Sequence, residues 1–252
     1  MTRLIGVLTA LAVTAGAGGW CAGGDKADAG AILDKSIKAL GGADKLGAAK
    51  AVTWKSKGKI NFGGNENEFT MQVTIQGLDH MRSEFEGDFG GNKIVGVTVL
   101  KGDKAWRKFA DNNMDLDEAA VASEKRNLYL QVAPMTPTVL KGSGYKVEAA
   151  GEEQVGGKAA VALKATGPDG KHFTIYFDKE SGRPVKQVAK VIGFMGEEFT
   201  QETTLGNYKE FGGVHKATKI NSKRDGEDFV SVEITEFRVL DKVDPKTFAA
   251  PE

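Results

Sequence analysis

Short segments of alternating apolar and polar residues fill the last third of the chain. They predict six strands that are separated by little more than glycine-rich or charged turns. Such short connections favour antiparallel pairing, because a parallel crossover needs a dozen or more residues. Phe173, Ile175 and Phe177 share one face of their strand and are expected to be buried. The six ranges are 159–166, 171–177, 185–192, 197–208, 214–224 and 229–240.

The same alternation begins at Ala51 and continues to residue 109, where the clearest example is the series from Phe69 to Ile75. Three other segments have helical character. Residues 31–40 place apolar side chains at helical spacing after Asp28, a candidate N-cap, and residues 44–50 favour a short second helical turn. Residues 115–131 predict a third helix, which Pro134 and Pro137 are expected to close.

These elements predict a mainly β (α+β) fold. The expected architecture is a single, strongly curved antiparallel sheet, a half-barrel of about eleven strands with helices on its concave face. A plain two-sheet sandwich fits less well, because the separate helical segments would each need a place to pack. The half-barrel domain is expected to span residues 31–252.

The N-terminal segment has the pattern of a secretory signal peptide over residues 1–22. Arg3 precedes an apolar run, and Ala15-Gly16-Ala17 offers a cleavage site. Residues 23–30 are then a linker, and the protein is expected to be exported, periplasmic or envelope-associated. The alternatives are an uncleaved anchor helix and a lipid anchor at Cys21, although Trp20 fits a lipidation signal poorly.

Composition narrows the classes of partner. The chain has 34 basic and 34 acidic residues, and this balance argues against nucleic acid as a partner. Cys21 is the only cysteine, so an intramolecular disulfide cannot form and the apolar core must hold the domain together.

Catalytic motifs are absent from the sequence. It contains no nucleophile elbow, zinc-protease motif or phosphate-binding loop, so we expect no enzyme and no cofactor. The histidines, His80, His172 and His215, are too scattered to predict a metal site. The acidic cluster from Asp111 to Asp117 has the spacing of a calcium loop but lacks its glycine and its bidentate glutamate.

Large apolar side chains supply the candidate binding site. An incomplete barrel has a concave face that can hold a hydrophobic ligand. The alternative interpretation is that these side chains and the helices form a filled core. The residues expected to line such a cavity are Trp54, Phe69, Met71, Phe85 and Trp106.

The order of turns and strand ends resembles the LolA/LolB-like superfamily of outer-membrane lipoprotein-sorting proteins. The similar features are Gly167-Pro168-Asp169-Gly170 before a strand, Gly182-Arg183-Pro184, Asn207-Tyr208 and the closing Phe248 with Pro251. The resemblance covers most of residues 31–252. It implies a half-barrel of about eleven strands with helices plugging the concave side, and a non-enzymatic carrier of acyl chains.

The resemblance also implies an arginine that holds a helical lid closed, but it does not assign that role to Arg82, Arg107 or Arg126. The sequence therefore predicts an exported carrier of lipid or of lipoprotein acyl chains, with an envelope membrane as a further partner. The alternative is an envelope-anchored or secreted binding or structural domain with a filled core.

Overall fold

The computed structural model describes residues 28–62, 64–193 and 196–251, so residues 1–22, with Cys21, lie outside the described part. The helices are α1 (Ala29–Ala39), α2 (Ala43–Ala48) and α3 (Glu118–Met135), and the 3₁₀ helices are η1 (Pro137–Lys141) and η2 (Pro245–Phe248). The strands are β1 (Ala51–Phe62), β2 (Asn65–Gln76), β3 (His80–Phe89), β4 (Asn92–Lys101), β5 (Lys104–Phe109), β6 (Asn112–Asp115), β7 (Lys146–Val155), β8 (Lys158–Thr166), β9 (His172–Asp178), β10 (Pro184–Ile192), β11 (Glu198–Phe211), β12 (Val214–Arg224) and β13 (Glu227–Leu240).

All thirteen strands form one antiparallel sheet in the order β6-β5-β4-β3-β2-β1-β13-β12-β11-β10-β9-β8-β7. Two meanders, β1–β6 and β7–β13, meet where β1 pairs with β13. This confirms the predicted fold class, a single curved sheet with helices, but the expected count of about eleven strands was too low. The four residues of β6 are all exposed, so no apolar alternation marks that strand in the sequence.

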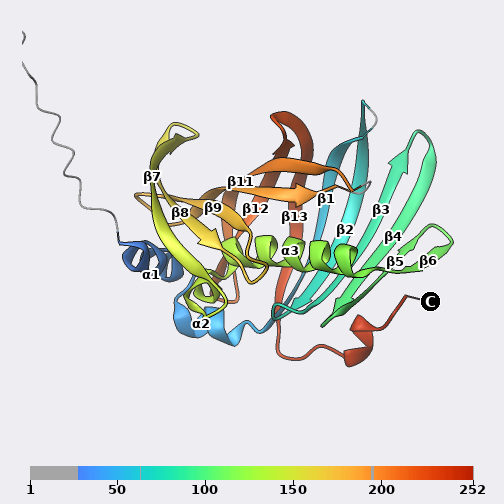
Figure 1. The fold of residues 1–252 in the computed structure, drawn as a ribbon, viewed down its shortest axis with the longest axis horizontal. Helices are drawn as coiled ribbons and strands as arrows, with labels where there is room; N and C mark the ends of the chain where they lie inside the picture. The colour runs from blue at the N-terminus through green and yellow to red at the C-terminus, as the bar shows by residue number, and fades with distance from the viewer. Residues whose placement is uncertain (1–27, 63, 194–195, 252) are drawn as a thin grey trace, which may run out of the picture.

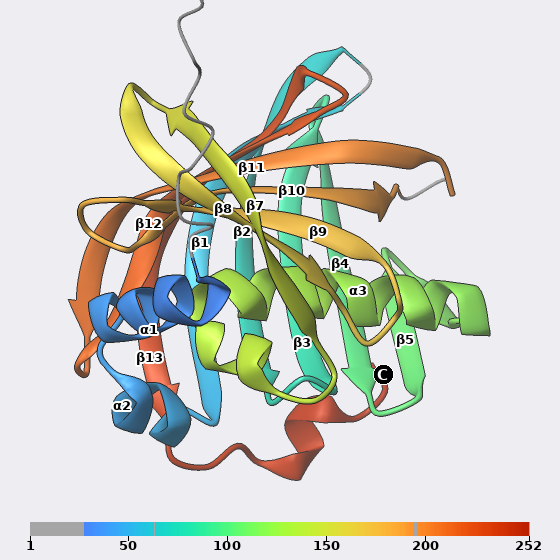
Figure 2. The same cartoon turned by 60° about the vertical axis from the view of Figure 1, so that its left-hand side comes forward.

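Helix α3 crosses the concave face because of this topology. It follows β6 at one edge of the sheet and leads, through η1, to β7 at the other edge. Its 18 residues span roughly 27 Å at 1.5 Å per residue. Figure 1 shows α3 running across the strands, and Figure 2 shows the sheet curling around α1 and α3.

Two apolar clusters make up the core, and α3 contributes to both. Val121, Leu128 and Val132 belong to the cluster under β1–β5 and β12–β13. Leu130 and Ala133 belong to the cluster under β8–β10. Because α3 is buried on two sides, its apolar residues do not form the single stripe of a surface helix.

The remaining local predictions were largely right. Asp28 caps α1 by accepting a 3.0 Å hydrogen bond from the Gly30 amide. Helix α3 begins later than expected, after Asp117, which caps it by accepting from the Ala120 amide. Pro134 lies inside the last turn of α3 and does not end it. Phe173, Ile175 and Phe177 are all buried, as predicted.

The outer face is covered in one place by the C-terminal segment. Phe248 of η2 is buried and packs edge-on against His80 at the start of β3. Arg82 donates to the Thr247 carbonyl oxygen from the same face. This contact explains why Val99, which pairs with Arg82, is fully buried although it lies on the face opposite α3.

We expect Phe177→Ala to lower the free energy of unfolding by about 3–5 kcal/mol, because a fully packed aromatic side chain leaves a cavity. Phe62→Ala is the matched control, since Phe62 is 56% exposed and its loss should cost less than about 1 kcal/mol. Urea denaturation measures both values. A loss below about 1 kcal/mol for Phe177→Ala would contradict the packing described here.

Candidate functional site

Strand pairing divides the side chains between an inner face, which carries α3, and an outer face. Residues directly opposite each other in neighbouring strands share a face. One paired row runs from Trp54 in β1 through Val73 in β2 to Arg107 in β5. Arg107 pairs with Glu124 of α3 at 2.6 Å, so this row faces the helix.

Four of the five predicted binding residues lie on the inner face. Trp54 belongs to the row just described. Phe69 and Met71 lie four and two residues from Val73 along β2 and therefore share its face, and Phe85 pairs with Met71. Trp106 is the exception, because it pairs with Val99 on the outer face, and this corrects the expectation for that residue. Its neighbour Arg107 takes the inner position in β5.

A row of aromatic rings continues from these residues toward the tips of the strands. The ring centroids of Phe69 and Phe85 are 5.3 Å apart, those of Phe85 and Phe89 6.0 Å, and those of Phe89 and Phe62 6.2 Å. Phe69 is buried, Phe85 and Phe89 are half-buried, and Phe62 is exposed. These four residues are called the aromatic row below.

The aromatic row lies beyond the part of the sheet that α3 covers. In Figure 1 the strand ends of β1, β2 and β3 extend past the helix. Near α3, by contrast, Trp54 is buried and stacks on Phe237. The inner face is therefore packed under the helix and partly open beyond it.

Lys216 of β12 is a buried cation on this face. Its Nζ lies 5.1 Å from the centroid of the Trp54 ring. Burial lowers the pKa of the Lys216 ammonium to about 8. Tyr208 and His215 share a small cavity with it, and neither is a carboxylate that could compensate its charge.

Three consecutive residues attach α3 to the sheet. Glu124 accepts from Arg107, and Lys125 pairs with Asp103 in the β4–β5 turn. Arg126 makes the most extensive contact, with Asp169 in the β8–β9 turn at 2.8 Å and with the carbonyl oxygens of His172 and Lys190. The sequence did not assign any of these roles, because the partners lie 17 to 64 residues away along the chain.

Glu124 is held in a dry environment by this arrangement. Burial raises the pKa of its carboxyl group, and the Arg107 guanidinium opposes that rise. An ion pair of this kind contributes little net stability but is costly to break, because the remaining charge would be left unpaired.

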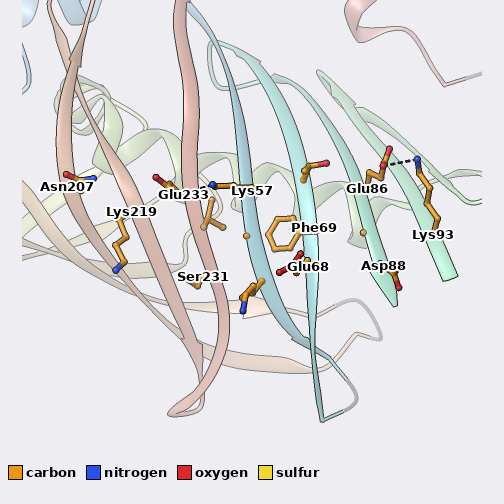
Figure 3. A pocket seen from close by; sticks show the side chains of 15 residues that line it. Lys57, Glu68, Phe69, Glu86, Asp88, Lys93, Asn207, Lys219, Ser231 and Glu233 are labelled. Atoms are coloured by element: carbon orange, nitrogen blue, oxygen red, sulfur yellow. Dashed lines mark ion pairs between the residues drawn. The ribbon is translucent and has the colours of Figure 1, made fainter. Parts of the chain in front are cut away.

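The outer face carries a different feature, an open cavity of about 890 Å³. Figure 3 shows it with α3 passing behind the strands. Four lysines and four acidic residues line it, and some pair with each other, for example Lys93 with Glu86 at 2.8 Å. Charge-balanced, exposed walls suit a solvated surface and not an acyl chain. The charged lining residues are Lys57, Lys59, Lys93, Lys219, Glu68, Glu86, Asp88 and Glu233.

Within residues 28–62, 64–193 and 196–251 there is no group of three or more His, Cys, Asp or Glu side chains that could hold a metal ion. Asp111 lies in the turn between β5 and β6, Asn113 lies in the exposed strand β6, and Asp117 caps α3. None of the helices in that same part of the chain is long and apolar enough to cross a membrane.

Comparison with solved structures identifies the architecture. A LolA superfamily protein from Nitrosomonas europaea aligns with a TM-score of 0.58 at 12% identity, over 88% of this chain and 97% of that one. The chain has a LolA-like fold. A putative outer membrane lipoprotein-sorting protein domain from Vibrio parahaemolyticus gives a TM-score of 0.52 at 10% identity, over 86% and 97%.

A DUF1329 family protein from Desulfovibrio piger also aligns, with a TM-score of 0.55 at 13% identity over 88% of this chain and 97% of that one. No protein-family model and no curated protein matches the sequence. The likeness is therefore one of backbone arrangement, which is what the turns and strand ends of the sequence had indicated.

Arg126→Ala should lower the free energy of unfolding by about 3 kcal/mol, because it removes three hydrogen bonds and leaves the Asp169 carboxylate, whose side chain is 19% exposed, with only the Lys171 amide as a partner. Lys125→Ala is the matched control, since its partner Asp103 is 95% exposed and the pair is worth less than about 1 kcal/mol. Chemical denaturation compares the two variants. Equal losses would show that Arg126 does not anchor α3.

Lys216→Met should raise the free energy of unfolding at pH 7 by about 1–3 kcal/mol, because the wild-type ammonium is buried without an acidic partner. The folded-state pKa is below the unfolded value of 10.5, so the penalty is full below pH 8 and disappears as the pH rises toward 10.5. The difference between the two proteins should narrow over that range in urea titrations. A variant less stable than wild type at pH 7 would contradict this reading.

Proposed function

We propose that the protein is an exported, non-enzymatic carrier or binder of lipid or of lipoprotein acyl chains, which lie on the inner face of the half-barrel. The observation that carries this proposal is the aromatic row, which is apolar, only partly buried and on the face that the helices cover elsewhere. Its binding surface comprises Trp54, Phe69, Met71 and Phe85, with Phe89 and Phe62 at the rim.

The energetics favour an acyl chain as the ligand. Each methylene group moved from water to an apolar surface gains about 0.8 kcal/mol. Phe85 and Met71 are half-buried and directly paired, so a chain that covers them removes apolar surface on both sides from water. A filled-core binding domain, the alternative, gives no reason for a continuous row in which Phe85 and Phe89 are only half-buried and Phe62 is exposed.

The proposal that the protein is exported rests on the signal-peptide pattern of residues 1–22. An exported carrier would take its lipid from an envelope membrane or deliver it to one. The similar structures include a putative outer membrane lipoprotein-sorting protein domain, which supports the same proposal at the level of fold. No catalytic role is assigned to any residue of the inner face.

Met71→Glu should weaken binding of a neutral amphiphile, such as monopalmitoylglycerol, by at least about tenfold, because it places a charge among the inner side chains. Thr70→Glu is the matched control, since Thr70 is the exposed neighbour on the outer face of the same strand. Calorimetric titration below the critical micelle concentration measures both affinities, and thermal melting checks that each variant is folded.

Two outcomes would overturn the proposal. The first is a wild-type protein that binds no long-chain amphiphile and retains none, by native mass spectrometry, when purified from its own envelope. The second is equal weakening by the two substitutions, which would place the chain outside the inner face.

A further inference from the structure

Among the cations that the described strands place on the inner face, Lys216 is the most deeply buried. Its side chain starts on β12, crosses β13 and ends over the Trp54 ring of β1, with only 9% of the residue exposed. No carboxylate and no hydrogen-bond acceptor contacts its Nζ among the described residues. Within the described part of the chain, the cation–π contact with Trp54 is the one compensation for its charge.

This compensation is smaller than the cost of burial. A cation–π contact recovers only part of the free energy that is lost when an ammonium ion is removed from water. Because the cost of burial exceeds this gain, the pKa of Lys216 is lowered to about 8. At pH 7 the Lys216 side chain is still protonated in most molecules, so the folded protein keeps a positive charge that its described residues do not neutralise.

The other inner-face cations are compensated in place. Arg107 forms its 2.6 Å ion pair with Glu124. Arg224 is only half-buried, lies 3.7 Å from the Phe229 ring centroid and donates to Gln201. Lys216 therefore differs from them in having neither an anion nor substantial contact with solvent.

Building on the proposed function, we infer that Lys216 binds the anionic group, a carboxylate or phosphate, of an amphiphile whose hydrocarbon chain lies along the inner face of β1 and β2. The ligand class is thus an anionic lipid, and a neutral acyl compound would bind more weakly.

The strand geometry provides a path for the chain. The distance along β1 from Trp54 to Ile60 is roughly 20 Å at 3.3 Å per residue, and Ile60 lies beside the aromatic row. A Cβ atom on Gly58 would lie 2.9 Å from the Phe69 ring, so this ring lies across the backbone of β1. A chain leaving Lys216 would therefore meet mainly apolar side chains, with Ser56 and Asn67 as the polar exceptions on β1 and β2.

Entry of the anionic group requires movement of the end of α3. Pro134 and Met135 enclose the small cavity beside Lys216, together with Tyr208. Pro134 has no amide hydrogen, so the last turn of α3 lacks one of its backbone hydrogen bonds. The three charged attachments of α3 are all nearer its other end, at residues 124–126.

The test compares palmitate with monopalmitoylglycerol, which has the same chain but no charge, by calorimetric titration at pH 7 below the critical micelle concentration. Wild-type protein should bind palmitate at least tenfold more tightly. In Lys216→Met this preference should fall below twofold, while affinity for monopalmitoylglycerol stays within threefold. Lys219→Met is the matched control, because Lys219 is exposed on the outer face of the same strand and its loss should leave the preference unchanged.

The outcomes separate this inference from the function on which it rests. If neither compound binds, the proposed function fails and the inference fails with it. If both bind equally well to the wild type, or if Lys216→Met keeps the preference, only the inference is overturned. Acetate and inorganic phosphate at the same concentrations should produce no Lys216-dependent heat, and a Lys216-dependent signal from either would replace the lipid site with a site for small anions.

Discussion

The long connection between β6 and β7 determines how the rest of the molecule is arranged. Because these strands are the two edges of a thirteen-stranded sheet, the chain has to return across its full width, and α3 does so through the concave side. The helix separates the core into two apolar clusters and is buried on both sides. A single helix is too narrow to cover long strands over their whole length, so the inner face is packed under α3 and partly open beyond it.

Charged side chains have different environments on the two faces of the sheet. On the outer face, lysines and acidic residues alternate in solvent and pair with each other, so their contribution to stability is small. On the inner face, Arg107 pairs with Glu124 of α3, Arg224 is half-buried over the Phe229 ring, and Lys216 is buried without an anion among the described residues. Buried charge is costly, so the uncompensated site is the one that most needs a functional explanation.

Much of the fold could be predicted from local sequence. Alternation defined the strands, and Asp28 and the Phe173–Phe177 strand were placed correctly because their signals lie within a few residues. The exposed β6 gave no such signal, and the face of Trp106 could not be known without the register of β5. The roles of Lys216 and Arg126 were missed for another reason. In the sequence, a lysine in an alternating segment and an arginine in a helix both have the pattern of solvated side chains, and only the pairing of distant strands buries them. Their burial among apolar residues is a tertiary property.

The central claim is that an acyl chain occupies the inner face beyond α3. The most direct measurement is photo-crosslinking with a palmitoyl compound that carries a diazirine near its methyl end, followed by mass-spectrometric mapping of the labelled residues. The account predicts label on inner-face residues of β1 to β3, in particular Met71, Phe85 and Phe89. Label concentrated on outer-face residues such as Thr70 and Val95, or spread evenly over both faces, would contradict it.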